Sequence, residues 1–398
     1  MDEQRLRAHL RDADVPDAAA AQLRARALVT RAHADRPRRR PSGLLTARLA
    51  IAAAFVLTVV AVTAVRGPSA VAHWVGKTLR ITAAKPVHAT PVSITNLPGR
   101  GRLLVTAGTQ TWLVGDGHTQ RVPGVSGSVT WSAFGRYLAF AQDRQLSAAD
   151  LTGRVVWTER FAAPVSAPSW SPDGNRIAFR VGAKLHVTAG NGTVSHAVRR
   201  AHASRPVDAR SVMPAWRPGA AHVVAVVDRP TRITVVNTDT GAPIWRVHAP
   251  ARTFALSWSA DGRRLLAVGR GQTRLFGPSG QLLWQWSAAH GTSYRAGVIS
   301  PSGRQIALLR SDGHSHDTAE LRTTHSPARV LTSALDLGDL TFSPDGRWLL
   351  VGWHRADSWL FFATAAADRR VRQITHVAGR LNSGQPVVEG WCCARPRG

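Results

Sequence analysis

The stretch Trp170-Ser171-Pro172-Asp173-Gly174, with the apolar run at 176–180 behind it, decides the fold because the chain repeats it. Three further plain copies begin at Trp258, Ile299 and Phe342, two altered copies begin at Trp131 and Trp216, and a weak copy begins at residue 96. The first residues of successive copies are 35, 39, 46, 42, 41 and 43 residues apart. A repeat of this length that is rich in strand and turn signals is typical of the blades of a β-propeller.

Each repeat divides into four strands, which the third copy shows most clearly at 167–170, 176–180, 184–188 and 193–198. The Asp-Gly pair suits the hairpin turn because glycine tolerates positive φ and aspartate hydrogen-bonds its own backbone. The aromatic residue before the turn offers a large apolar surface for packing one blade on the next. The residues expected to carry the repeat are Trp131, Trp170, Asp173, Gly174, Trp216, Trp258, Asp261, Gly262, Phe342, Asp345 and Gly346. We predict an all-β fold, a seven-bladed propeller, with six blades as the alternative.

The two ends of the repeat region complement each other. The weak first copy supplies strands at 102–107, 110–114 and 119–122 but no first strand, whereas residues 386–391 resemble a first strand, with Trp391 at the aromatic position. Pairing this C-terminal strand into the first blade would remove an open sheet edge. We predict that it closes the ring, so that the propeller spans 96–393 and a basic end follows at 394–398.

A charge-free apolar stretch at 49–65, extended across Arg48, is long enough to cross a membrane as a helix at 44–66. Residues 1–43 carry ten arginines, whereas the 20 residues after the span carry few cations. This asymmetry places the N-terminus inside and the propeller outside the cell membrane. We predict a retained single-pass anchor followed by a linker at 67–95. The alternative is a signal peptide that is cleaved after Ala72.

The cytoplasmic tail at 1–43 is basic and contains strong helix formers, with a helix start near Pro16 and Asp17. Two short helices ahead of a membrane span could dock a cytoplasmic partner. The alternative is a helical tail held on the membrane surface by anionic lipid.

The chain carries a formal net charge of +27, from 51 Lys and Arg against 24 Asp and Glu. Such a surface attracts anionic partners, for example lipid headgroups or acidic envelope polymers. The cations are spread along the chain without a nucleic-acid-binding motif, which argues against nucleic acid as a partner.

Cysteine occurs only at Cys392 and Cys393, which excludes a disulfide framework and a cysteine-based zinc site. Outside the cytoplasm the pair could be free thiols, a disulfide between neighbours or links between chains, and it could also serve packing at the ring closure. A bond between neighbouring cysteines would be easily reduced, which makes a redox element conceivable.

The Trp-Ser-Pro-Asp-Gly turn followed by an Ile-Ala-Phe-like strand resembles the WD40-like (PD40) repeats of the TolB family of periplasmic propellers, with clear copies over residues 129–353. The layout of basic tail, span, propeller and terminal Gly390-Trp391-Cys392-Cys393 also resembles a group of uncharacterised bacterial single-pass membrane proteins. The resemblance implies extracytoplasmic protein binding and brings no catalytic residues. The anchor and the lack of a recognisable N-terminal α/β domain differ from TolB itself.

The chemical motifs of the chain are weak. Thr-Gly-x-x-x-Trp turns, as at 152–157, resemble repeats of quinoprotein dehydrogenases, but no cluster for calcium and quinone accompanies them. His314-Ser315-His316-Asp317, in a polar loop of the sixth blade, could form a weak metal site or simply be exposed. No nucleophile elbow, zinc-protease motif or phosphate-binding glycine loop is present.

We therefore expect no catalytic residue, no cofactor and no metal. The expected function is a membrane-anchored extracytoplasmic scaffold that binds a protein or an anionic envelope polymer. The alternatives are a transmembrane sensor that couples the propeller to a cytoplasmic regulator, and a cryptic enzyme.

Overall fold

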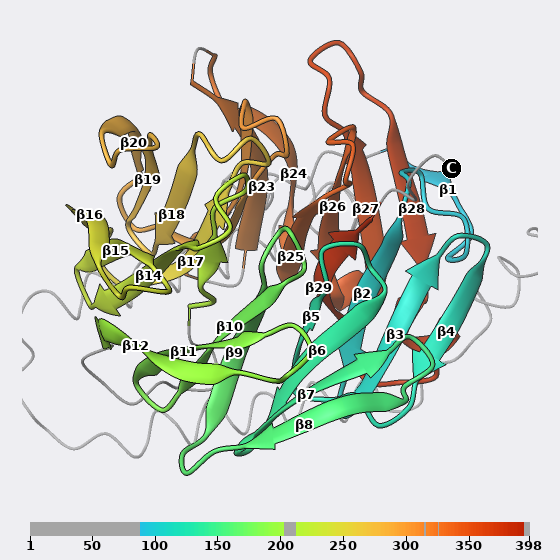
Figure 1. The fold of residues 1–398 in the computed structure, drawn as a ribbon. Helices are drawn as coiled ribbons and strands as arrows, with labels where there is room; N and C mark the ends of the chain where they lie inside the picture. The colour runs from blue at the N-terminus through green and yellow to red at the C-terminus, as the bar shows by residue number, and fades with distance from the viewer. Residues whose placement is uncertain (1–87, 203–211, 314–315, 325, 394–398) are drawn as a thin grey trace, which may run out of the picture. The chain divides into compact units, whose positions relative to one another are not determined.

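The computed structural model describes residues 88–393 apart from 203–211, 314–315 and 325 (Figure 1). These residues form seven sheets, each built on four antiparallel strands, and the fold is therefore the seven-bladed propeller rather than the six-bladed alternative. The predicted tail, the span at 44–66 and most of the linker lie outside the described residues. Within the described ranges, no helix is long and apolar enough to cross a membrane.

In every blade the four strands are ordered from the innermost strand outward. Blade 1 contains β29 (Val387–Cys392), β2 (Arg102–Ala107), β3 (Gln110–Gly115) and β4 (His118–Val122). Blade 2 contains β5 (Ser128–Trp131), β6 (Tyr137–Gln142), β7 (Gln145–Asp150) and β8 (Val155–Arg160). Blade 3 contains β9 (Val165–Trp170), β10 (Arg176–Val181), β11 (Lys184–Ala189) and β12 (Ser195–His202). Blade 4 contains β13 (Ala215–Trp216), β14 (Val223–Arg229), β15 (Arg232–Asn237) and β16 (Pro243–His248).

The remaining three blades follow the same order. Blade 5 contains β17 (Thr253–Trp258), β18 (Leu265–Gly269), β19 (Gln272–Phe276) and β20 (Leu282–Ser287). Blade 6 contains β21 (Ser293–Ile299), β22 (Gln305–Ser311), β23 (His316–Thr323) and β24 (Arg329–Leu335). Blade 7 contains β25 (Leu337–Phe342), β26 (Trp348–Trp353), β27 (Ser358–Ala363) and β28 (Val371–Thr375), with β1 (Thr90–Pro91) outside β28. Two short helical segments are η1 (His354–Ala356) and α5 (Val377–Arg380).

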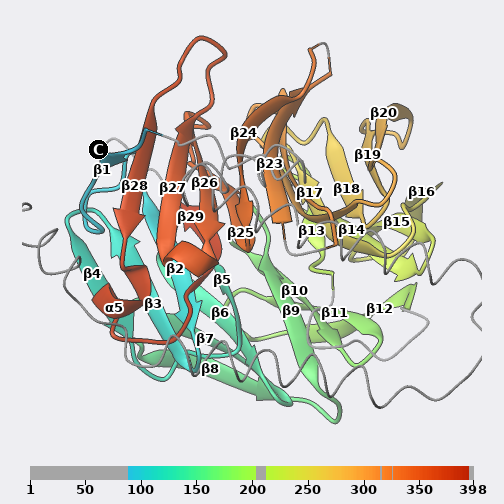
Figure 2. The ribbon, with the colours of Figure 1, turned by 180° about the vertical axis from the view of Figure 1, so that it is seen from behind.

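The innermost strands form a closed ring. Each contacts the innermost strand of the next blade, in the order β5, β9, β13, β17, β21, β25 and β29, and β29 contacts β5 again (Figures 1 and 2). The second strand of each blade packs between two neighbouring blades and is mostly buried on both faces. β18 is buried along its whole length, as is β27. Such strands are continuous apolar runs instead of alternating patterns.

The prediction that the C-terminal strand closes the ring is confirmed. β29 pairs antiparallel with β2, and Trp391 lies opposite Leu103 while Cys392 lies opposite Arg102. The indole of Trp391 is buried and meets the ring of Phe361 in blade 7 edge to face, with 5.7 Å between centroids. The last strand therefore completes the sheet of blade 1 and packs against blade 7 at the same time.

The start of the propeller differs from the sequence-based boundary at residue 96. β1 pairs in parallel with β28, and the Val92 N–H donates to the carbonyl oxygen of Gln373 at 2.9 Å. Ile94 is buried in the core between blades 7 and 1. Residues 90–95, predicted from sequence to be linker, thus belong to the propeller because they cover the otherwise unpaired outer edge of blade 7.

The repeated turn is stabilised by its own side chains. In blade 3, Asp173 Oδ1 accepts hydrogen bonds from Ser171 Oγ at 2.5 Å and from the Asn175 N–H at 3.1 Å. Ser171 Oγ in turn accepts the N–H of Arg176 at 2.9 Å. Gly174 has φ +76°, a conformation that costs little only for glycine. The Asp-Gly pair therefore has a structural role within its own turn.

A second polar contact fastens the closing strand at the opposite end from these turns. Asp339 Oδ2 accepts the Val388 N–H at 3.2 Å and lies 3.3 Å from His354 Nε2. The hydrogen bond to Asp339 and the negative charges of Asp339 and Asp336 raise the pKa of His354, although partial burial opposes them. Protonation of the imidazole therefore strengthens its contact with the carboxylate that holds β29.

We expect deletion of residues 385–398 to unfold or aggregate the propeller. The deletion removes β29, so the apolar strand β2 becomes an edge strand whose backbone hydrogen-bonding groups are unpaired. Thermal unfolding and size-exclusion chromatography measure the outcome. A truncated chain that stays monomeric and melts cooperatively would contradict the assignment of β29 as the essential closing strand.

We also expect a pH dependence from His354. Since its folded pKa is raised, its stabilising contribution is complete below about pH 6.5, its unfolded value, and is lost as pH rises through the folded pKa. The difference in melting temperature between the natural chain and His354→Gln should therefore be largest near pH 6 and shrink toward pH 9. A difference that does not vary with pH would show that the pair is not charged.

Candidate functional site

The repeated turns all lie at one end of the blades, together with the turns between third and fourth strands. We call this surface the turn face. The residue two positions after the turn glycine lies at or directly before the start of the second strand, and its N–H donates to the turn serine, as Arg264 does to Ser259 Oγ at 3.0 Å. From this position a long polar side chain reaches the next blade. Arg264 Nη1 donates to the Gly303 carbonyl oxygen at 2.6 Å, and Gln305 Nε2 donates to that of Thr364 at 2.9 Å.

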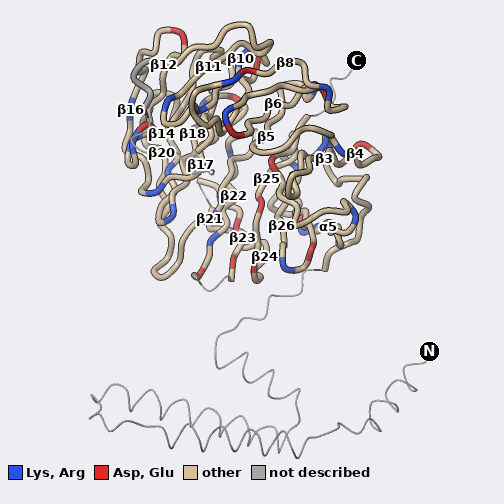
Figure 3. The backbone as a smooth tube through the Cα atoms, turned by 90° about the horizontal axis from the view of Figure 1, so that it is seen from below, with Lys and Arg blue, Asp and Glu red and all other residues tan. Residues whose placement is uncertain are grey.

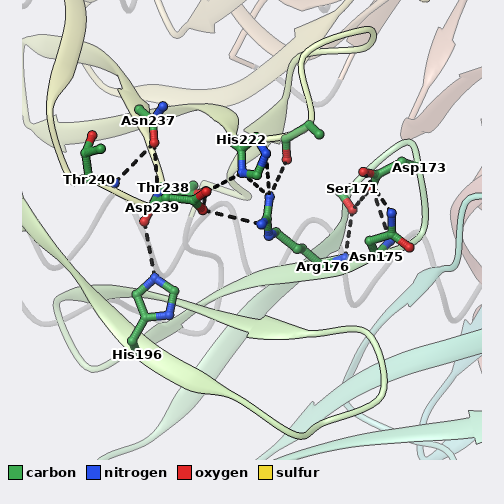
Figure 4. A network of polar contacts seen from close by, with 11 residues as sticks. Ser171, Asp173, Asn175, Arg176, His196, His222, Asn237, Thr238, Asp239 and Thr240 are labelled. Carbon is green, nitrogen blue, oxygen red and sulfur yellow. Dashed lines mark hydrogen bonds and ion pairs between the residues drawn. The ribbon is translucent and has the colours of Figure 1, made fainter.

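The junction between blades 3 and 4 shows the same contact in a larger form (Figure 4). Arg176 donates to the carbonyl oxygen of Ala221 at 3.1 Å and pairs with Asp239 at 3.5 Å. His222 Nδ1 lies 2.6 Å from Asp239 Oδ2 and also contacts Arg176. His196, from β12, reaches the carbonyl oxygen of Thr238 at 3.2 Å. These groups are partly exposed, so they define how the two blades meet more than they stabilise the chain.

Blade 4 has an altered turn and uses a different residue for the same purpose. Arg217 Nε donates to the Gly262 carbonyl oxygen at 2.9 Å, and its guanidinium lies 5.4 Å from the centre of the Trp258 ring. Between blades 1 and 2, Arg102 lies 5.6 Å from the Trp131 ring and 3.4 Å from the Gly135 carbonyl oxygen. We call each such cross-blade contact of a polar side chain with the next blade's backbone a clasp.

In two blades the residue two positions after the turn glycine, which makes the clasp in blades 3, 5 and 6, is aromatic. Each of these two aromatic residues borders a groove. In blade 7 the residue is Trp348, beside a groove of about 390 Å³ toward blade 1. In blade 2 it is Tyr137, whose N–H bonds to Ser132 Oγ at 2.9 Å as the clasp residues do in their turns. The groove between blades 2 and 3 measures about 570 Å³. Within the described residues the Tyr137 side chain makes no hydrogen bond to blade 3, and it lines this groove instead.

This blade 2–3 groove is the candidate functional site. It is lined by Ser132, Phe134, Arg136, Tyr137, Ala148, Val156, Trp157, Trp170, Asp173, Gly174, Asn175, Ala189, Gly190, Asn191 and Thr193. Aromatic and aliphatic side chains from both blades make up much of the lining, with a few polar groups among them. That composition is typical of binding sites in which apolar contact supplies affinity and polar groups set orientation.

Phe134 is the most exposed aromatic residue of the described propeller, with 64% of its surface accessible. It stands where the turns at Trp170, Trp258 and Phe342 have aspartate, so no carboxylate binds the turn backbone and the ring projects outward. A Cβ atom built on Gly174 would lie 3.6 Å from its Cε2, which places the ring against the turn of blade 3. An exposed phenylalanine in a turn has no packing role of its own and is a typical contact residue for a partner.

The outer end of the groove is held by Trp157. Its Nε1–H donates to the Gly190 carbonyl oxygen of blade 3 at 3.0 Å. A Cβ atom on Gly192 would lie 2.6 Å from the indole, so only glycine lets the ring approach the turn so closely. Trp245 repeats the contact two junctions later, with the Pro278 carbonyl oxygen at 3.0 Å. The tryptophan of the Thr-Gly-x-x-x-Trp motif therefore bonds one blade to the next, and Trp157 also lines the groove.

At the inner end, Trp170 differs from Trp216 and Trp258. The indole N–H groups of those two residues donate to the preceding blade, to the Ser169 and Ala215 carbonyl oxygens at 2.9 and 3.1 Å. The buried Nε1 of Trp170 has no acceptor in the described structure. A buried donor without a partner costs about 1–3 kcal/mol, so the junction of blades 2 and 3 is less tightly bonded than those at Trp216 and Trp258.

The cysteine pair supports the turn that carries Phe134. The sulfur atoms of Cys392 and Cys393 lie next to each other, and which of the three states left open by the sequence the pair adopts stays a prediction. Cys393 Sγ lies 3.5 Å from the Ala133 carbonyl oxygen, and a Cβ atom on Gly135 would lie 3.2 Å from it. The end of the closing strand thus packs beneath the turn of blade 2.

Asp173 is the one carboxylate among the described lining residues, and it is ionised. Partial burial alone would raise its pKa, but hydrogen bonds from Ser171 and from the backbone and side chain of Asn175 outweigh burial and lower the pKa. Asn191 Oδ1 likewise accepts hydrogen bonds from Thr193 Oγ1 at 2.7 Å and from the backbone N–H of Thr193 at 3.2 Å. The acceptor groups of these turns are used internally.

The structure separates the sequence-predicted residues by role. Asp173, Asp261 and Asp345, with Gly174, Gly262 and Gly346, stabilise their own turns. Trp131, Trp170, Trp216, Trp258 and Phe342 lie at the blade junctions, and Trp391 does so at the closure. Of these residues only Trp170, Asp173 and Gly174 line the groove. Its exposed residues Phe134, Arg136, Tyr137 and Val156 were not singled out from the sequence, although phenylalanine at 134, where three other copies have aspartate, was a visible signal.

The histidine-rich loop of blade 6 differs from its predicted form. His314 and Ser315 lie outside the described residues, and His316 and Asp317 begin β23. Asp317 is fully buried, accepts the Leu337 N–H at 3.1 Å and lies 3.4 Å from Arg295 Nη1. Burial raises the pKa of Asp317, although Arg295 opposes it. Among the described residues, no group of three or more His, Cys, Asp or Glu is placed to hold a metal ion.

No family model and no curated protein sequence matches the chain. Among solved structures, the β-propeller domain of Myceliophteria thermophila Cps50 (Swd1) is 17% identical with a TM-score of 0.47, over 63% of this chain and 86% of that chain. Kuenenia stuttgartiensis hydrazine synthase is 15% identical with a TM-score of 0.46, over 61% of this chain and 77% of that chain. These similarities transfer neither a partner nor an activity, and the propeller assignment rests on the seven sheets. The TolB-like resemblance stays a prediction from sequence.

We expect Arg264→Ala to lower the free energy of unfolding by about 1–2 kcal/mol, because it removes a charged donor from the Gly303 carbonyl oxygen. The matched control is Arg304→Ala, an exposed arginine directly after a turn glycine, which should cost less than about 0.5 kcal/mol. Urea denaturation followed by tryptophan fluorescence measures both. Equal losses in the two variants would contradict the clasp.

Proposed function

We propose that this chain is a membrane-anchored, extracytoplasmic β-propeller that binds a protein partner in the blade 2–3 groove. The observation that carries the proposal is the open junction at Tyr137, which brings Phe134 of blade 2 and Trp170 of blade 3 into one groove. Propellers commonly act as binding platforms, and function has to be argued from the site grafted on the fold. An exposed aromatic cluster at a groove is the usual anchor for a protein partner.

The placement outside the membrane rests on the sequence. The apolar stretch at 44–66 follows ten arginines and precedes a cation-poor segment, which favours an N-terminus inside and a propeller outside. In the propeller, lysine and arginine lie on several blades instead of forming one basic face (Figure 3). A localised ligand therefore needs a local site, and the groove supplies one.

The proposal is tested by photo-crosslinking in cells that express the full chain. A photoreactive amino acid replaces Phe134 in one variant and Ser302 in the other, because Ser302 occupies the same turn position in blade 6. We expect one extracytoplasmic protein to be captured in high yield from position 134 and not from 302. Mass spectrometry identifies the adducts.

Three results would decide against parts of the proposal. Equal capture from both positions would show that the groove is not the site. Capture of cytoplasmic proteins alone would contradict the placement outside. A second, specific partner captured from a probe in the tail at 1–43 would favour the transmembrane sensor over the plain scaffold.

A further inference from the structure

The side chain of Arg136 is part of the lining of the groove. Arg136 directly follows the turn glycine, as Arg304 does in blade 6, and both side chains are exposed. In the described structure the Arg136 guanidinium makes no hydrogen bond and no ion pair, whereas Arg217 and Arg264 are engaged by the backbone of the next blade. Arg136 therefore brings an unsatisfied positive charge and five donors to the edge of the groove.

Apolar surface lies beside this charge. Val156 is 53% exposed and Tyr137 is 43% exposed, and with Phe134 they form an accessible apolar strip on blade 2. Trp157 and Trp170 are partly buried and form the walls. A strip of this kind accepts one or two aromatic or aliphatic side chains, since exposed apolar patches of a folded chain mark contact surfaces.

The remaining polar groups offer donors. The Asp173 carboxylate is saturated by its own turn, and Asn191 Oδ1 is held by Thr193. The side-chain amide N–H groups of Asn191 and the hydroxyl of Tyr137 carry no hydrogen bond within the described residues. A ligand that supplies acceptors and negative charge would satisfy these groups together with Arg136, in a chain whose net charge is +27.

We infer that the groove recognises an extended acidic peptide segment with an aromatic or aliphatic anchor residue. The anchor packs on Phe134, Val156 and Trp170, and a neighbouring carboxylate pairs with Arg136. This inference rests on the proposed function, because it names the chemistry of the partner segment at the same groove.

The test uses the full chain in nanodiscs of zwitterionic lipid. The probe is a fluorescent pentapeptide of four glutamates around one phenylalanine, and its matched partner has lysine in place of each glutamate. Anisotropy titrations should show binding of the acidic peptide only. Arg136→Glu should weaken this binding at least tenfold, since a charged hydrogen bond in a desolvated contact is worth roughly that factor. Arg304→Glu, the matched reversal in blade 6, should leave it unchanged.

Folding controls keep the result interpretable. Arg136 is exposed, so Arg136→Gln and Arg136→Glu should have the same melting temperature as the natural chain. The affinity of the glutamine variant for the acidic peptide should lie between those of the natural chain and the glutamate variant. Phe134→Asp restores the plain turn residue and should abolish binding while preserving or raising stability.

Several outcomes would overturn the inference. Equal losses of peptide affinity in Arg136→Glu and Arg304→Glu would show that the peptide responds to the overall charge of the chain and not to Arg136 at the groove. Binding of polygalacturonate, and not of the peptide, would assign the groove to an anionic polysaccharide. If position 134 still captures a protein while Arg136→Glu leaves that capture unchanged, the proposed function stands and the acidic ligand class is wrong. If position 134 captures nothing, both fall.

Discussion

The pairing of β29 with β2 is the constraint on which the rest of the propeller depends. Every other blade is completed by strands that follow one another in the chain, but blade 1 takes its innermost strand from residues more than 280 positions away. Because all seven inner strands contact their neighbours in a cycle, the contacts that link blade 7 to blade 2 through β25, β29 and β5 form only when this strand is in place. The polar contact of Asp339 with Val388 and His354, and the packing of Trp391 on Phe361, hold that strand at its two ends.

The groove follows from the same architecture. A ring needs seven junctions, and most of those within the described residues are joined on the turn face by a side chain that donates to the backbone of the next blade. Tyr137 breaks the pattern between blades 2 and 3, and Phe134 removes the carboxylate that would have tied its turn together. The junction of blades 2 and 3 thus contains a largely apolar groove with Arg136 at its edge.

Much of the fold could be predicted from the sequence because each repeat contains its own strand and turn signals within about 40 residues. Trp170 through Gly174 specify a strand end and a hairpin, and Trp391 without a following blade indicates the closure. The β1 pairing was missed because two residues, Thr90 and Pro91, leave no periodic pattern. The groove was missed for a different reason. Phe134 and Trp170 lie in separate repeats, and their meeting depends on how two blades pack together, which neither repeat shows alone. The arginines at 176, 217 and 264 resemble ordinary surface cations until their acceptors in the next blade are known.

The clasp also bears on how such a ring can diversify. Each junction on the turn face is governed by one or two side chains outside the core, so a junction can open or close by substitutions that leave the buried strands untouched. Changes at these positions can therefore shift a binding groove from one junction to another without repacking the core. Related propellers with nearly identical cores would then present their grooves at different angular positions, and their partners would have to be sought junction by junction.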